Sequence, residues 1–180
     1  NRSLWGFKKH SEDKDFDTSS FTLGATNNSS PFWSAFSDYY TLEGDGTLEA
    51  KFVNYTAGAN NWENWLLACS TDANRGATGY SEYFVQRADL WWWGTGVDGS
   101  NKDCTSNYNW DTFKKDMNGA TVLLTVNRSG NTITVSYDMT TTAGTKYWYK
   151  FTRTTSFANT IRFFFSNEKS HQVFEYVRVQ

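Results

Sequence analysis

The sequence is poor in the residues that hold small domains together covalently or through metals, with two cysteines and two histidines among 180 residues. Cys69 and Cys104 are far apart, and neither belongs to a Cys-x-x-Cys pair. Because His10 and His171 are the only histidines, a structural zinc site is not expected. A disulfide and a pair of thiols both remain open, since a chain of this length buries a core without a bridge.

Long apolar runs and an excess of one charge are also missing. The longest apolar runs, Trp65–Cys69 and Leu90–Trp93, are far shorter than the roughly 20 residues of a membrane-spanning helix, so we expect a soluble chain. Seventeen basic and 19 acidic residues leave a formal net charge of −2. A nucleic-acid partner is not expected, because binding phosphates requires a basic stripe.

Pro31 is the only proline, and no repeat or Pro-rich or Ser-rich linker divides the chain. We therefore expect one domain over residues 1–180. The sequence begins at Asn1 and lacks a charged segment followed by an apolar one, which is typical of a mature or excised piece of a longer protein.

What the sequence has in abundance is aromatic residues, which make up 18% of it and include nine tryptophans. Apolar and polar residues alternate with period two almost throughout, between clusters of Gly, Asn, Asp and Ser, which predicts strands. The predicted fold class is all-β, a two-sheet antiparallel β-sandwich or jelly roll. The expected strands are Phe21–Leu23, Ser34–Leu42, Thr47–Tyr55, Trp62–Ser70, Ser81–Arg87, Leu90–Trp93, Ala120–Asn127, Thr132–Met139, Lys146–Thr154, Thr160–Ser166 and Val173–Val179.

Two local features add detail. The clearest hairpin runs from Thr121 to Asp138, with Gly130 supplying the positive φ of its turn. The only helical segment expected is Trp110–Lys115, one or two turns inside a long polar loop from Gly94 to Asn118. Loops longer than about 12 to 15 residues are often functional.

The strongest site signal lies in residues 80–94, which combine charged residues with a tryptophan triplet. If this stretch is extended, alternation assigns one face to a groove and the other to the core. The groove set is Tyr83, Val85, Arg87, Asp89, Trp91 and Trp93, and the core set is Phe84, Gln86, Ala88, Leu90 and Trp92. Guanidinium, carboxylate and indole groups suit a sugar, which has an apolar C–H face and a rim of hydroxyls. Alternatively, Arg87 and Asp89 form a structural ion pair and the indoles fill the end of the sandwich.

A second signal precedes it, in residues 60–69. Alternation buries Trp65 and turns Trp62 and Asn64 to the other face, where an amide can bind sugar hydroxyls. Asn60 and Asn61 can equally be turn residues.

Carboxylates give weaker signals. The acidic segment Glu12–Asp17 is either a solvated turn or a set of hard oxygen ligands for structural calcium. Glu49, Glu63, Glu82 and Glu175 lie in expected strands, but no Glu-x-Asp-x-Glu triplet, nucleophile elbow or phosphate loop occurs. The sequence therefore favours a protein without catalytic residues and without a required cofactor.

Three segments carry a resemblance to a known family: Trp62–Trp65, Glu82–Gly94 and the hairpin Val126–Ile133. Together with the closing segments Phe163–Ser166 and Phe174–Val179, they resemble carbohydrate-binding modules and lectin-like domains of the concanavalin A-like jelly-roll type. The resemblance implies a secreted or cell-surface module of a larger polysaccharide-degrading protein. It implies a neutral β-glucan, xylan or related plant or microbial polysaccharide as the ligand.

The sequence thus predicts a non-catalytic carbohydrate-binding module that uses tryptophan stacking and polar side chains. The ligand-binding residues expected are Trp62, Asn64, Tyr83, Gln86, Arg87, Asp89, Trp91 and Trp93, although alternation points Gln86 away from the others. Two other functions stay open: a sandwich-fold glycoside hydrolase or polysaccharide lyase, and an adhesion or spacer domain that binds protein through a flat aromatic patch. The polymer, the parent protein and the oligomeric state are not indicated.

Overall fold

A computed structural model of the chain describes residues 9–11, 16–17, 20–24, 35–37, 39–56, 63–71, 78–89, 92–94 and 102–180. Within these ranges, no helix is long and apolar enough to cross a membrane.

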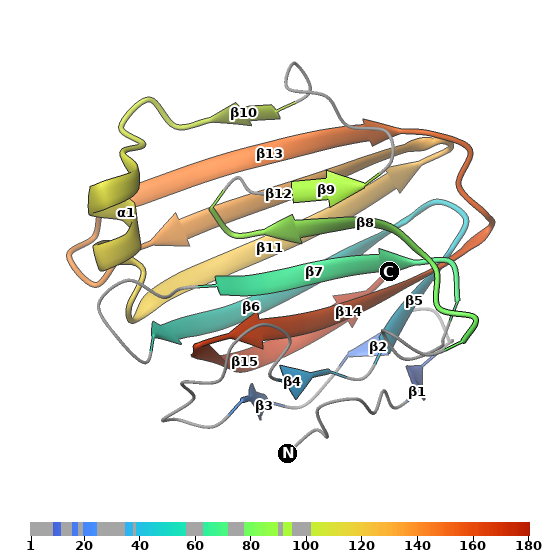
Figure 1. Ribbon diagram of the computed structural model, residues 1–180, viewed down its shortest axis with the longest axis horizontal. Helices are drawn as coiled ribbons and strands as arrows, with labels where there is room; N and C mark the ends of the chain where they lie inside the picture. The colour runs from blue at the N-terminus through green and yellow to red at the C-terminus, as the bar shows by residue number, and fades with distance from the viewer. Residues whose placement is uncertain are drawn as a thin grey trace.

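The described residues form two stacked sheets and one short helix (Figure 1). The seven-stranded sheet has the order β1-β5-β14-β7-β8-β9, with β4 also paired to β14. The eight-stranded sheet has the order β10-β13-β12-β11-β6-β15-β2, with β3 also paired to β15. The elements are β1 (Lys9–Ser11), β2 (Phe16–Asp17), β3 (Phe21–Leu23), β4 (Ala35–Phe36), β5 (Tyr39–Glu43), β6 (Gly46–Thr56), β7 (Glu63–Cys69), β8 (Glu82–Arg87), β9 (Trp92–Gly94), β10 (Lys102–Cys104), α1 (Trp110–Asp116), β11 (Ala120–Ser129), β12 (Thr132–Thr140), β13 (Lys146–Thr154), β14 (Thr160–Glu168) and β15 (Ser170–Val179).

The predicted antiparallel sandwich is confirmed, with one parallel pairing, between β1 and β5. The long strands follow the alternation of the sequence. In β11, for example, Val122, Leu124 and Val126 point into the space between the sheets and are buried, while the residues between them are partly exposed. One apolar core therefore fills the space between the two sheets.

The predicted strand Ser34–Leu42 is divided into β4 and β5, and Ser37 lies at the division. Ser37 is fully buried, its backbone N–H donates to the Phe165 carbonyl, and its Oγ accepts from the Phe165 N–H, both at 2.9 Å. A side chain thus replaces one backbone partner in the ladder, and the register shifts by one residue. The predicted helix Trp110–Lys115 is confirmed as α1, while the short strands β1, β2 and β10 were not predicted.

The outer faces of the two sheets differ. On the seven-stranded sheet the outward residues form a second apolar cluster, and each of them is at most 3% exposed: Tyr39, Trp65, Leu67, Cys69, Val85 and Phe164. On the eight-stranded sheet the outward residues are mostly polar and partly exposed, and they include Tyr55, Trp148 and Val173 at 36–39% exposure. One sheet is therefore buried on both faces over its centre, whereas the other meets solvent.

The two cysteines lie in different sheets. Cys69 is in β7 of the seven-stranded sheet, Cys104 is in β10 of the eight-stranded sheet, and both are thiols. The alternative left open by the sequence is resolved in favour of two thiols.

Candidate functional site

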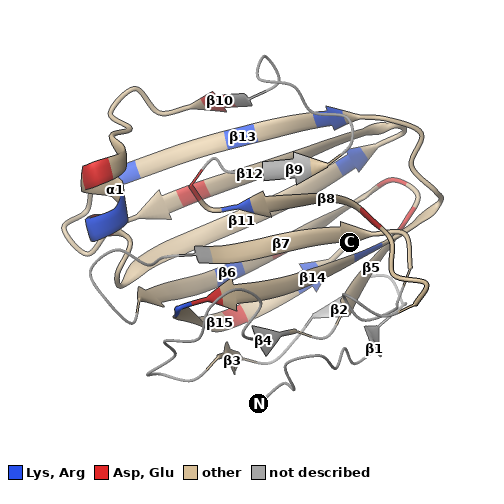
Figure 2. Cartoon of the chain, viewed as in Figure 1, with Lys and Arg blue, Asp and Glu red and all other residues tan. Residues whose placement is uncertain are grey.

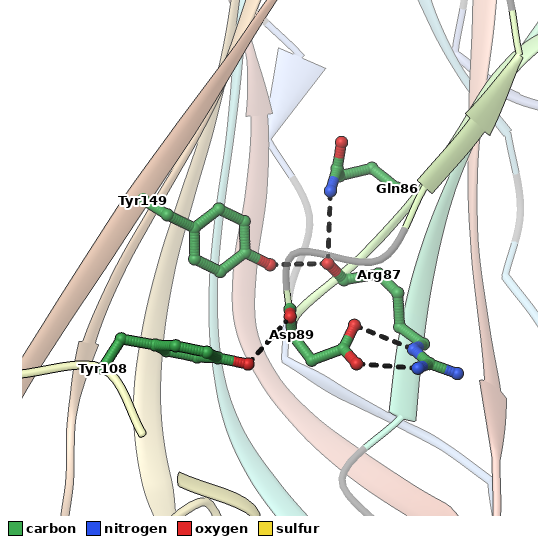
Figure 3. Close-up of polar contacts among 5 residues, drawn as sticks. All are labelled: Gln86, Arg87, Asp89, Tyr108 and Tyr149. Carbon is green, nitrogen blue, oxygen red and sulfur yellow. Dashed lines mark hydrogen bonds and ion pairs between the residues drawn. The ribbon is translucent and has the colours of Figure 1, made fainter. Parts of the chain in front are cut away.

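The candidate site is the end of β8 and the turn that follows it. Arg87 Nε donates to Asp89 Oδ1 at 2.9 Å and Arg87 Nη2 donates to Asp89 Oδ2 at 2.7 Å, so the two planar groups meet side by side (Figure 3). The Arg87 side chain is 15% exposed and that of Asp89 only 5%. The pair therefore sits at the surface with its carboxylate largely withdrawn from water.

Residues of the opposite sheet and its loops fix the backbone under this pair. Tyr149 Oη donates to the Arg87 carbonyl at 2.6 Å, and Tyr108 Oη donates to the Asp89 carbonyl at 3.0 Å (Figure 3). Gln86 Nε2 also donates to the Arg87 carbonyl, at 3.3 Å. Two hydrogen bonds from distant parts of the chain and one from the neighbouring Gln86 thus hold the backbone of the two residues that carry the ion pair.

Gln86 itself is fully buried between the sheets, and its Oε1 accepts from Arg153 Nη2 at 3.0 Å. Arg153, on β13, is fully buried too, and its guanidinium carbon lies 4.1 Å from the centre of the Phe84 ring. Such a cation over an aromatic face is stabilised in a dry core. Gln86 therefore lies on the core face, as alternation indicated, and supports Arg87 from behind.

On the outer face, the Arg87 guanidinium lies 5.1 Å from the centre of the Trp65 ring. Residues Trp65 and Arg87 are opposite each other in the antiparallel pairing of β7 and β8. Trp65 is completely buried, as predicted. Arg87 thus covers Trp65 on one side while it binds Asp89 on the other.

Asn64 lies next to the same turn, since its carbonyl accepts from the Ala88 N–H at 3.4 Å. Its side chain is buried, and Nδ2 donates to Asn54 Oδ1 at 3.4 Å. Asn54 Oδ1 also accepts from Gln172 Nε2 at 2.8 Å. The Asn64 amide therefore belongs to a buried amide network that joins the two sheets.

Tyr83 lies at the other end of β8, away from the ion pair. A β-bulge shifts the pairing there, so that Ala68 faces Phe84 but Cys69 faces Glu82, and Tyr83 is the extra residue. Tyr83 packs against the inner core, and its hydroxyl accepts from the Ala158 N–H at 2.9 Å. Strict alternation had assigned Tyr83 to the outer face, and the bulge is the physical reason for the difference.

Several predicted residues lie outside the described part of the chain. Trp62 and Trp91 are outside it. Of the acidic segment Glu12–Asp17, only the backbone of β2 is described. For Trp93 the backbone is described: it belongs to the edge strand β9 and pairs with Val85. The tryptophan part of the site therefore stays a prediction.

The charge of the pair affects its neighbours. Burial, and then the nearby Asp89 carboxylate, raise the pKa of the Tyr108 hydroxyl above its ordinary value, so it remains a hydrogen-bond donor at any physiological pH. Burial lowers the pKa of the Arg153 guanidinium to about 9. Both groups thus keep the protonation state that their hydrogen bonds require.

The Arg87–Asp89 pair is poorly suited to acid–base chemistry. Asp89 is the only buried carboxylate among the described residues, and a guanidinium occupies both of its oxygens. Such a carboxylate is poorly placed to exchange a proton with a substrate. Within the same ranges, no three His, Cys, Asp or Glu residues gather closely enough to hold a metal ion.

Tyr108 and Tyr149 belong to the site but were not among the predicted residues. Tyr149 alternates with surface residues in β13, a pattern that indicates only a core position. Tyr108 is in a polar loop, where the sequence gives no sign of its contact with Asp89.

No protein-family model and no curated protein matches the sequence. Solved structures that match this chain include lectin I-B4 from Griffonia simplicifolia in its metal-free form, at 11% identity over 93% of this chain and 91% of the lectin, with a TM-score of 0.45. Peanut lectin with a 9-residue peptide has the same identity and TM-score, over 96% and 94% of the two chains. The match to the metal-free carbohydrate recognition domain of Emp46p covers 78% of this chain and 73% of that domain, at 11% identity and a TM-score of 0.36. These values do not assign the chain to a family.

Proposed function

We propose that residues 1–180 form a carbohydrate-binding domain that leaves its ligand unchanged. The observation that carries the proposal is the Arg87–Asp89 pair, held rigid at the end of β8 by hydrogen bonds from Tyr149 and Tyr108. A fixed pair of planar donor and acceptor groups next to an edge strand rich in tryptophan suits hydroxyl recognition. The lectin-like resemblance of the sequence points to the same class of ligand.

In this proposal the residues have different tasks. Trp62, Trp91 and Trp93 stack on sugar rings, and Arg87 with Asp89 binds the hydroxyls beside them. Gln86 and Asn64 position that pair through their buried hydrogen bonds, and Tyr83 anchors the other end of β8. Ring stacking with a few polar contacts corresponds to dissociation constants of about micromolar.

The proposed ligand is a neutral plant-type or microbial polysaccharide of the β-glucan or xylan class. Figure 2 shows basic and acidic residues interspersed over the two sheets and α1, which gives little attraction for a polyuronate. We further propose that the domain is part of a larger secreted or cell-surface protein that degrades polysaccharides.

Affinity electrophoresis in gels that contain xylan, mixed-linkage β-glucan or a galactomannan tests the proposal. We expect wild-type chain to be retarded by at least one polymer and the double variant W91A/W93A to lose most of the retardation. W110A is the matched control, because Trp110 is 40% exposed on α1 and belongs to no proposed site. Retardation by none of the polymers, or equal retardation of W91A/W93A and wild type, contradicts the proposal.

A further inference from the structure

The outer face of the eight-stranded sheet contains a hollow of about 170 Å³ over β6, β11 and β15. Its lining is Lys51, Phe52, Val53, Thr121, Val173 and Glu175. This face lies on the other side of the sandwich from β8 and the Arg87–Asp89 pair (Figure 1).

The register of the strands explains why the hollow is there. Val173, Val53 and Thr121 are opposite one another on three adjacent strands, so three short β-branched side chains form one row. The residues two positions away along β6 are long: Tyr55 on one side of the row and Lys51 on the other. The floor of the hollow is therefore low and largely apolar, between taller neighbours.

Each of these taller neighbours is held in place. Tyr55 stacks on His171, with ring centres 4.9 Å apart and planes 15° from parallel. On the other side, Lys51 Nζ lies 3.0 Å from Glu175 Oε2, and Glu175 is the extra residue of a β-bulge in β15. Bulges of this kind re-aim a side chain. The hollow thus has an aromatic ring near one side and an ion pair, with exposed polar atoms, on the other.

An exposed tryptophan lies on the same face. Trp148 is 39% exposed on β13, and the pairings Lys51–Leu123, Leu123–Asp138 and Asp138–Trp148 place it in one row with Lys51. Adjacent strands are about 4.8 Å apart, so Lys51 and Trp148 are about 14 Å apart across three strand spacings. A ligand that touches both is longer than one sugar ring.

The charges on this face are balanced. Over β6 and β15, Lys51 pairs with Glu175, and Arg178 Nη1 lies 4.0 Å from Glu49 Oε1. On β13 the exposed Lys146 and Lys150 flank Trp148, and the carboxylates of Asp138 and Asp103 lie on the neighbouring strands opposite Trp148 and Lys150. An acidic polymer needs an excess of cations, and this face carries as many carboxylates as cations among these residues. The apolar floor of the hollow, the indole ring of Trp148 and the hydrogen-bond donors and acceptors around them together complement a neutral, hydroxyl-rich ligand.

We propose that the outer face of the eight-stranded sheet is a second binding site, for a neutral linear oligosaccharide that runs across the strands from Trp148 to the hollow over Val53 and Val173. Trp148 stacks on one ring, the hollow receives another, and Lys51, Glu175, Thr121 and Asp138 bind hydroxyls between and beside them. The proposal does not depend on the site at β8, so either site can fail without the other.

The test is a ¹H–¹⁵N NMR titration of the full chain with xylohexaose, cellohexaose, laminarihexaose and mannohexaose. We expect at least one of them to shift the amide signals of Val53, Thr121 and Val173 together with the indole N–H of Trp148. W148A should weaken this binding about tenfold, which corresponds to the loss of one stacked ring. V53F, which fills the hollow, should weaken it as well, and W110A should leave it unchanged.

The titration separates this site from the one at β8. Shifts on this face that W148A and V53F reduce support the proposal even where W91A/W93A binds normally. No shift on this face with any of the four oligosaccharides overturns it, as do shifts that W148A leaves intact. A concentration-dependent dimer that W148A abolishes also overturns it, because the face is then an interface between copies of the chain.

Discussion

The outer faces of the two sheets show how similar alternation patterns lead to different surfaces. On the seven-stranded sheet, Trp65, Leu67 and Phe164 point outward and yet are completely buried. On the eight-stranded sheet, outward residues such as Trp148 and Tyr55 remain more than a third exposed. An outward aromatic residue on the central strands β7 and β14 of the seven-stranded sheet therefore has a structural role, whereas Trp148 and Tyr55 on the eight-stranded sheet are open to a ligand.

The largest effect expected from this contrast concerns two tryptophans. Trp65→Ala removes a fully buried indole and the surface on which Arg87 rests, and should lower the free energy of unfolding by about 3–5 kcal/mol. Trp148→Ala should lower it by less, roughly 1–2 kcal/mol, because more than a third of the side chain is already in water. Urea unfolding monitored by circular dichroism measures both. Equal losses for the two variants contradict the distinction between the faces.

The second-largest difference is expected in how much stability is lost when the ion pair of each face is broken. Asp89→Asn leaves Arg87 without its carboxylate at a nearly dry position, and we expect a loss of about 2 kcal/mol in the free energy of unfolding. Glu175→Gln breaks an exposed pair and should cost less than about 1 kcal/mol. The same urea titrations compare them. A larger loss for Glu175→Gln than for Asp89→Asn would show that exposure to water does not determine how much these ion pairs stabilise the fold.

A smaller effect is the pH dependence due to His171. Burial lowers the pKa of this imidazole, so below about pH 6.5, the ordinary histidine value, the unfolded chain binds a proton that the folded chain binds less readily. Stability due to this group is therefore present above that pH and is lost as the pH falls. Wild type should lose more stability between pH 8 and pH 5 than His171→Phe, which keeps the ring against Tyr55. Urea midpoints that fall equally with pH in the wild type and in His171→Phe contradict the assignment of this pH dependence to His171.

Much of the fold could be predicted from the sequence because the long strands alternate cleanly. Lys146–Thr154 was predicted with the observed bounds of β13, and the hairpin of β11 and β12 within two residues. The short strand β10 was missed because Lys-Asp-Cys carries no apolar alternation. The division at Ser37 depends on a buried hydroxyl replacing a backbone partner, which no local pattern indicates.

The candidate site was predictable only in part. The Arg87–Asp89 ion pair, which the sequence leaves open as the alternative to a sugar-binding role, is present in the structure, and Trp65 is buried as predicted. Tyr149 reaches Arg87 from 62 positions away, a contact that only the packing of the two sheets creates. The pattern of β13 carries a further signal, because Trp148 alternates with Tyr147 and Tyr149 and so lies on the opposite face from these two buried rings.

Saturation-transfer NMR on the wild-type chain mixed with the same four hexasaccharides tests most directly whether this sandwich binds a glycan and leaves it intact. We expect transfer from the protein to the ring protons of at least one oligosaccharide, with its anomeric signals unchanged after a day. Absence of transfer to all four contradicts sugar binding. New reducing-end or unsaturated signals that grow with time show that the domain is an enzyme.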